Sequence, residues 1–228
     1  MHLPTFIRGW ETVELLRHTP YGIQYKLRNN MGEFSLLRVT DIPASLELHR
    51  NLTKQGSAVF NSYCQNEISK FEKTLRIMYD FSSSPYILKP LEHIIHPFSN
   101  CNGFAFFARY EFLPTINSVF IERTLENAVK LFRDLCNGLR PIHQNNMLYG
   151  NILPSNIFFG NTFKLGEIVP YSPQTAFTPP EVFNGGPIGF HTDIYSVGAV
   201  VAWFLTSTPP PHSFSMLNGG IGYVISKA

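Results

Sequence analysis

The segment Leu148-Tyr-Gly-Asn-Ile-Leu-Pro-Ser-Asn-Ile157 carries two asparagines, Asn151 and Asn156, separated by Ile-Leu-Pro-Ser. An amide oxygen accepts a hydrogen bond, but it takes up no proton at physiological pH. Asn151 and Asn156 are therefore suited to holding other groups and not to acting as a base. Pro-Ser-Asn is also common in turns and caps, so the rest of the sequence has to decide what this segment is.

Further short segments surround it in a fixed order. Upstream are Leu16-Arg-His-Thr-Pro-Tyr-Gly-Ile-Gln-Tyr25 and Phe34-Ser-Leu-Leu-Arg-Val39. Downstream are Lys164-Leu-Gly-Glu-Ile-Val169, Thr178-Pro-Pro-Glu181 and His191-Thr-Asp-Ile-Tyr-Ser-Val-Gly198. In this order and at these intervals they resemble the landmarks of the protein-kinase family, from the Gly-rich loop to the helix that follows the A-P-E motif.

The resemblance assigns a role to each residue of the second half. Asn151 stands where the family has the Asp that accepts the substrate proton, and Asn156 stands at the metal-binding Asn. Glu167 occupies the position of the magnesium-binding Asp, which makes Asn156 and Glu167 the candidate metal ligands. Glu181 matches the Glu of A-P-E, and Asp193 would accept hydrogen bonds from loop amides; both duties are structural.

On the nucleotide side, the resemblance assigns one retained position and two changed ones. Gly22 is the single glycine that aligns with the Gly-rich loop, where backbone amides must approach phosphates closely. Leu36 replaces a small residue beside the adenine, and its bulk would intrude on the base. Arg38 stands at the position of the nucleotide-binding Lys and keeps the charge with a wider fork.

The remaining nucleotide-site residues come from a helix and from the connection between the lobes. Glu67 is the preferred carboxylate partner of Arg38, because it lies on the same helix face as Phe71, and Glu72 is the alternative. Tyr110 would be a large gatekeeper, followed by Glu111 at the hinge. Exposed, solvated side chains remain the alternative interpretation for Arg38 and Glu67.

Periodicity predicts an α+β chain. Strands are expected at residues 12–17, 22–28, 33–39, 86–95 and 104–110, helices at 60–78, at 125–139 and from about 192, and a hairpin around 160–161. The apolar face expected for the second helix is Leu125, Ala128, Val129, Phe132, Leu135, Cys136 and Leu139. Together with the resemblance, this predicts one two-lobed protein-kinase-like domain. Residues 1–112 would form a β-rich N-lobe with one main helix, and residues 113–228 a mostly helical, truncated C-lobe.

The composition narrows the classes of protein to which the chain can belong. The chain has 228 residues, of which 44% are hydrophobic, and 18 Lys+Arg against 16 Asp+Glu give a net charge of +2. The basic residues are scattered, which argues against a nucleic-acid partner. The apolar run 194–205 is too short for a bilayer, which needs about 20 residues, and no signal peptide is indicated. Three widely spaced cysteines favour a reduced, cytoplasmic setting without disulfides.

The resemblance implies a pseudokinase, with features of the bacterial Ser/Thr kinase-like branch, that binds or regulates another protein. The partner would be an active kinase or a chain that covers the truncated C-lobe, and no cofactor is expected. The alternative is a weak or atypical ATP-dependent Ser/Thr kinase, with ATP and magnesium held by Arg38, Glu67, Asn156 and Glu167. A decayed fragment without a function of its own is the third hypothesis.

Overall fold

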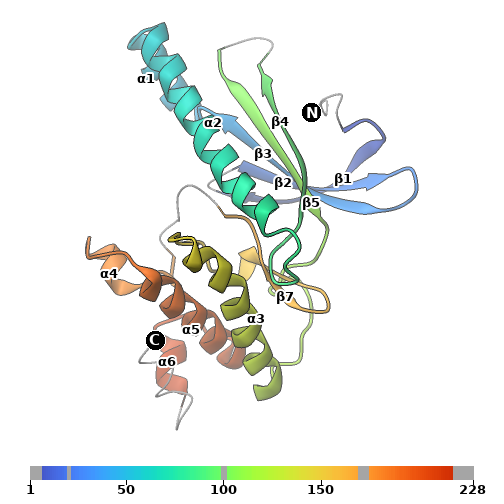
Figure 1. Ribbon diagram of the computed structural model, residues 1–228, viewed down its shortest axis with the longest axis vertical. Helices are drawn as coiled ribbons and strands as arrows, with labels where there is room; N and C mark the ends of the chain where they lie inside the picture. Colours follow the sequence, from blue (N-terminus) through green and yellow to red (C-terminus); the bar gives the residue numbers. More distant parts are fainter. Residues whose placement is uncertain (1–6, 20–21, 99–101, 169–174, 218–228) are drawn as a thin grey trace. The chain divides into compact units, whose positions relative to one another are not determined.

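The computed structural model describes residues 7–19, 22–98, 102–168 and 175–217. Within them the chain is α+β: a five-stranded antiparallel sheet in the N-terminal part is followed mainly by helices (Figure 1). Two compact units result, one made of Met1–Asp80 with Lys89–Phe112, the other of Phe81–Leu88 with Leu113–Ala228. None of the described helices is long and apolar enough to cross a membrane.

The first unit contains the sheet, in the order β1-β2-β3-β5-β4, and two helices. Its elements are β1 (Trp10–Thr19), β2 (Gly22–Asn29), β3 (Phe34–Ile42), α1 (Leu46–Lys54), α2 (Ser57–Asp80), β4 (Pro90–Pro97) and β5 (Phe104–Glu111). The predicted turn between β2 and β3 is confirmed, because the Asn29 side chain accepts the N–H groups of Met31 and Glu33, each at 2.9 Å. This Asx-type turn sets the register of the two strands.

Strand β3 is buried along most of its length, because side chains pack against both of its faces. Leu37 and Val39 join a cluster on one face with Leu27 and Phe107. On the other face, Phe106 of β5 stacks on Phe71 of α2 with ring centroids 5.2 Å apart. Helix α2 thus runs along one side of the sheet, and the Leu27, Leu37, Val39 and Phe107 cluster lies on the other (Figure 1).

The second unit packs helices around a short hairpin. Its elements are α3 (Leu125–Gln144), the 3-10 turn η2 (Pro154–Asn156), β6 (Ile157–Phe159), β7 (Phe163–Leu165), α4 (Pro180–Phe183), α5 (Phe190–Thr206) and α6 (His212–Met216). Helices α3 and α5 lie side by side (Figure 1). The predicted hairpin and both long helices are confirmed.

The buried face of α3 differs from the predicted one. The structure buries Ala128, Leu131, Asp134, Leu135, Gly138, Leu139 and Ile142. Leu125, Val129 and Phe132 are exposed, and Cys136 is only half-buried. At 100° per residue, the core-facing stripe lies about a quarter turn from the prediction.

The predicted strand 86–95 is also divided. Its second part is β4, whereas Leu88 donates its N–H to Leu165 O at 2.8 Å, and Leu165 donates to Tyr86 O at the same distance. Residues 86–88 thus extend the small hairpin of the second unit. Helix α1 was not predicted; it begins after Ser45, whose Oγ accepts the N–H of Leu48 at 3.2 Å.

Candidate functional site

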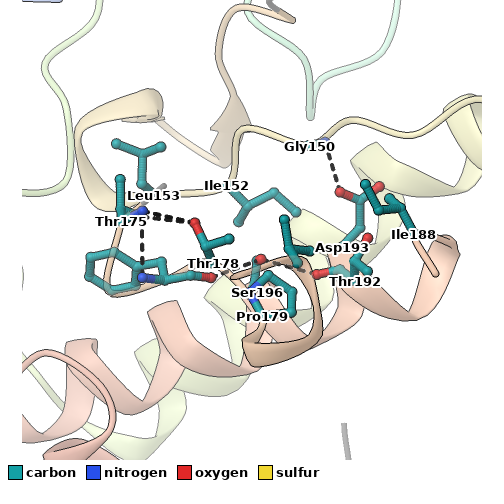
Figure 2. A pocket seen from close by; sticks show the side chains of 12 residues that line it. Gly150, Ile152, Leu153, Thr175, Thr178, Pro179, Ile188, Thr192, Asp193 and Ser196 are labelled. Carbon is teal, nitrogen blue, oxygen red and sulfur yellow. Dashed lines mark hydrogen bonds between the residues drawn. The ribbon is translucent and has the colours of Figure 1, made fainter. Parts of the chain in front are cut away.

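Asp193 anchors the segment that contains the two asparagines. It lies in the first turn of α5 and is 1% exposed. Its carboxylate accepts the N–H of Tyr149 at 2.9 Å and the N–H of Gly150 at 2.8 Å (Figure 2). The ring Nε2 of His143, from the end of α3, lies 2.8 Å from the same carboxylate. Asp193 therefore accepts the backbone hydrogen bonds that the resemblance implies, and His143 is an additional partner that sequence reasoning missed.

The backbone conformation at residue 150 favours glycine. Its φ is +69°, in the left-handed region. A residue with a side chain in that conformation costs about 1–2 kcal/mol. The backbone of this segment is thus adapted to glycine.

The side chain of Asn156 ties this segment to the residues after β7. Its Nδ2 lies 2.8 Å from Tyr149 Oη, 3.0 Å from Asn151 O and 2.9 Å from Glu167 O. Its Oδ1 accepts the N–H of Glu167 at 3.0 Å. Both ends of a buried amide are therefore engaged, which we call the Asn156 clamp.

Asn151 takes part in the same network. Its side chain is buried, and its Nδ2 donates to Glu167 O at 3.3 Å. Tyr149 Oη lies 3.4 Å from that carbonyl as well. Three donors thus converge on one peptide oxygen, and the Asn151 amide serves as one of them.

A glycine makes this approach possible. Gly166 donates its N–H to Asn156 O at 2.8 Å. A Cβ on Gly166 would lie 2.4 Å from Asn156 Oδ1 and 2.5 Å from Phe158 Cε2. Nothing in the sequence pattern beyond the family position marks Gly166, because its need is set by atoms brought there by tertiary packing.

The clamp bears on the predicted metal site. Magnesium takes oxygen ligands in near-octahedral geometry, and the resemblance would assign Asn156 Oδ1 and the Glu167 carboxylate to it. Asn156 Oδ1 already accepts a backbone N–H, and Glu167 is 3% exposed. The described residues contain no group of three or more His, Cys, Asp or Glu side chains that could hold a metal. Asn156 thus has a structural role in this network, while its Oδ1 keeps a second lone pair.

Residues 175–179 are fixed on α5 beside the loop (Figure 2). Thr175 donates its N–H to Thr178 Oγ1 at 2.9 Å, and Ser196 Oγ donates to Phe177 O at 2.9 Å. A small, mainly apolar cavity of about 90 Å³ lies between these residues, Leu153 and Thr192. It is large enough for about one small side chain and too small for a nucleotide.

Glu181 lies near a histidine. Its Oε1 is 3.7 Å from His191 Nε2, and both side chains are partly exposed. Burial, and then the carboxylate of Glu181, raise the pKa of Tyr195. Glu181 thus belongs to the surface around α4, while Asn151, Asn156 and Glu167 share one network.

In the first unit, Gly22 is required by a close backbone approach. Its φ is +131°, and a Cβ there would lie 2.1 Å from Val39 O. At the predicted phosphate loop, Arg17 Nε donates to Gln24 Oε1 at 2.6 Å, which links β1 to β2. Two positions of that loop, residues 20 and 21, lie outside the described residues, as does Val169.

The residues predicted to lie beside the adenine, Leu36 and Tyr110, are buried neighbours in the sheet near the end of β5. Leu36 pairs with Tyr110 across β3 and β5, and the two side chains are 1% and 0% exposed. Glu111 turns back onto the chain, since its Oε1 accepts the N–H of Lys89 at 2.8 Å. Large side chains therefore occupy this part of the first unit.

Arg38 and Glu67 share one side of the sheet. Arg38 is fully buried, and its Cζ lies 5.3 Å from the ring centroid of Phe71, one helical turn after Glu67. Glu67 is buried on α2 and accepts a hydrogen bond from Lys70 at 2.8 Å, whereas Glu72 is exposed. The geometry favours Glu67 over Glu72 and excludes the exposed alternative for both Arg38 and Glu67.

The candidate residues thus form two sets. Gly22, Leu36, Arg38, Glu67, Tyr110 and Glu111 belong to the first unit, and Asn151, Asn156, Glu167, Glu181 and Asp193 to the second. Each set is built by the packing of its own unit.

The chain is partially similar to a known protein kinase. The chain is 26% identical over 110 residues to the human protein named serine/threonine-protein kinase Nek10, covering 42% of this chain and 9% of that protein. No family model matches the chain. The finding is a distant similarity to a Ser/Thr protein kinase over less than a tenth of its length.

Proposed function

We propose that this chain is a kinase-like module that has lost phosphoryl transfer and works by binding another protein. One observation carries the proposal: at the position of the family's catalytic base is an amide, Asn151, whose NH₂ group is directed at Glu167 O at 3.3 Å. A catalytic base must accept the proton of the attacking hydroxyl. Asn151 presents a hydrogen-bond donor at that place, and this donor is already bonded to the backbone carbonyl of Glu167.

Two further observations support the same proposal. The Asn156 amide, which would contact magnesium in an active relative, is engaged at both ends. Leu36 and Tyr110 fill the sheet where the resemblance would seat the base. Asn151 lacks the proton acceptance that phosphoryl transfer needs, and Leu36 and Tyr110 take up room that nucleotide binding needs. Asn156 is retained, and its amide is engaged by the chain itself.

The proposed work is regulatory. The folded frame of a kinase without its chemistry leaves surfaces for a protein partner, and an active Ser/Thr kinase is the first candidate. We place the chain near the bacterial branch of the Ser/Thr kinases. Two segments support this placement: the short Pro-rich stretch before Glu181 and the sequence His191-Thr-Asp-Ile-Tyr-Ser-Val-Gly198.

Thermal melts of the purified chain, with ATP and with and without Mg²⁺, test the proposal. A ligand that binds only the native state raises the free energy of unfolding, by about 2.7 kcal/mol at a hundredfold excess over its Kd, and therefore raises the melting midpoint. We expect a cooperative melt that ATP and Mg²⁺ leave unchanged. A magnesium-dependent rise that Glu167→Ala removes, together with phosphate transfer to a generic protein substrate, would overturn it.

A weak Ser/Thr kinase is the second candidate, favoured by the position of Arg38. A fully buried guanidinium beside α2, near the buried Glu67, is the arrangement that an active relative needs for its phosphate-binding cation. This candidate predicts that Arg38→Met abolishes an ATP-dependent rise of the midpoint. Without such a rise in the parent chain, it is excluded.

A further inference from the structure

One face of α3 carries an apolar stripe that its own unit does not bury. Leu125, Val129 and Phe132 are 53%, 54% and 40% exposed, and Cys136 continues the stripe half-buried. Their spacing of four, three and four residues is that of the a and d positions of a coiled coil. A contiguous apolar stripe at this spacing suits the packing of a second helix.

The charges beside the stripe indicate what that second helix is. Glu126 and Arg133 are exposed, lie on the same flank of the stripe and are seven residues apart, about 10 Å along the helix. Lys130, by contrast, is committed to Asp134 of its own helix at 2.7 Å. One flank therefore offers an acid near the start of the stripe and a base two turns further.

This pattern is complementary to itself in the antiparallel sense. With a two-fold axis crossing α3 next to Lys130, Val129 of one copy would pack beside Phe132 of the other. Glu126 of each copy would then face Arg133 of the other, so the same ion pair forms twice. An interface that pairs one patch with itself is what a two-fold symmetric dimer requires.

We infer that α3 is the interface of an antiparallel homodimer, whose core is Leu125, Val129 and Phe132 and whose orientation is set by Glu126 and Arg133. A parallel arrangement would place this flank of the two copies on opposite sides of the interface, so Glu126 would not meet Arg133 and neither ion pair would form. The inference does not depend on the proposed function, since it uses no residue of the nucleotide or metal sites.

Sedimentation velocity tests the dimer over concentrations from about 1 µM to a few hundred micromolar, the range of weak association. We expect the parent chain to shift from monomer to twice the monomer mass, and Phe132→Glu to remain monomeric throughout. Phe183→Glu is the matched control, because Phe183 is 50% exposed on α4 and lies outside the stripe. A thermal melt of each variant verifies that it is folded.

A charge exchange tests the orientation. Glu126→Arg is expected to weaken the dimer about tenfold, because two attractions become two repulsions, and adding Arg133→Glu is expected to restore it. A parent chain that stays monomeric at the highest concentration overturns the inference. So does a dimer that Phe132→Glu leaves intact, or a charge exchange without recovery.

Discussion

Restoring the family's base, Asn151→Asp, is expected to destabilise the chain at neutral pH. The substitution keeps the shape of the side chain and replaces its NH₂ group with a carboxylate oxygen. That oxygen would lie at the place from which Nδ2 now donates to Glu167 O at 3.3 Å. Two acceptors would face each other at a position that is only 6% exposed.

The magnitude follows from the lost contact and the buried charge. A hydrogen bond contributes about 0.5–1.5 kcal/mol, and an unsatisfied buried polar group costs about 1–3 kcal/mol. A loss of about 2–4 kcal/mol at pH 7 is therefore expected, or about 4–16 °C in the midpoint for a chain of this size. Asn161→Asp, in the exposed bend between β6 and β7, is the matched control and should change the midpoint little.

The loss should depend on pH with a definite sign. Burial and the facing carbonyl disfavour the charged form, so the folded-state pKa of the new carboxyl should lie above its ordinary value of about 3.9. Between these two pKa values the folded state binds more protons than the unfolded state, so stability falls as pH rises through that window. Towards pH 4 the protonated acid can donate to Glu167 O again, and the variant should approach the parent.

Thermal melts at pH 7 and at about pH 4 measure this difference, each against the parent chain at the same pH. If Asn151→Asp were as stable as the parent at pH 7, the hydrogen bond to Glu167 would be irrelevant. If the deficit persisted unchanged at low pH, its cause would be packing and not charge.

Three further results are expected from the same structure. Gly22→Ala should lower stability by at least about 2 kcal/mol in urea unfolding, because its Cβ would meet Val39 O at 2.1 Å with φ at +131°. Gly166→Ala should lower the free energy of unfolding by about 1–3 kcal/mol, because its Cβ would overpack the Asn156 clamp. Gly160→Ala should be tolerated, because its Cβ would meet a flexible leucine methyl at 3.2 Å. Equal melting midpoints for the two variants would contradict this. Burial raises the pKa of the Cys136 thiol, so alkylation near pH 8, followed by mass spectrometry, should be several-fold slower in the native chain than in urea; equal rates would exclude the shift.

Sequence reasoning identified α3 but not its buried face, and the reason is physical. Apolar residues cover a wide arc of this helix, so several rotations bury a similar hydrophobic area. The actual rotation buries a carboxylate, because Asp134 accepts from Lys130 at 2.7 Å and from Phe163 N at 3.1 Å. Gly138 also packs inward, where a Cβ would lie 3.0 Å from Tyr86 O. Phe163 and Tyr86 come from distant parts of the chain, and helical periodicity carries no information about them.

The candidate site shows the same limit. The motif spacing predicted that Asn151, Asn156 and Glu167 belong together, and it predicted that Asp193 holds the loop. It did not predict the direction of the Asn151 amide, because the Glu167 carbonyl reaches it only through the hairpin and the close approach of Gly166. Motifs thus located the residues, while their hydrogen-bond roles were set by tertiary contacts.

The departures from the kinase pattern are mutually consistent, which bears on the hypothesis of a decayed fragment. Tyr149 and Asn151, two of the changed residues, both direct donors towards Glu167 O, and the retained Asn156 donates to the same oxygen. Independent loss of sequence would be expected to leave such buried polar groups unmatched, whereas these form one network. Agreement between local choices and the surrounding fold is characteristic of sequences that specify a structure. The network therefore counts against a decayed fragment, and a stable chain that ignores ATP would be the simplest signature of the proposed function.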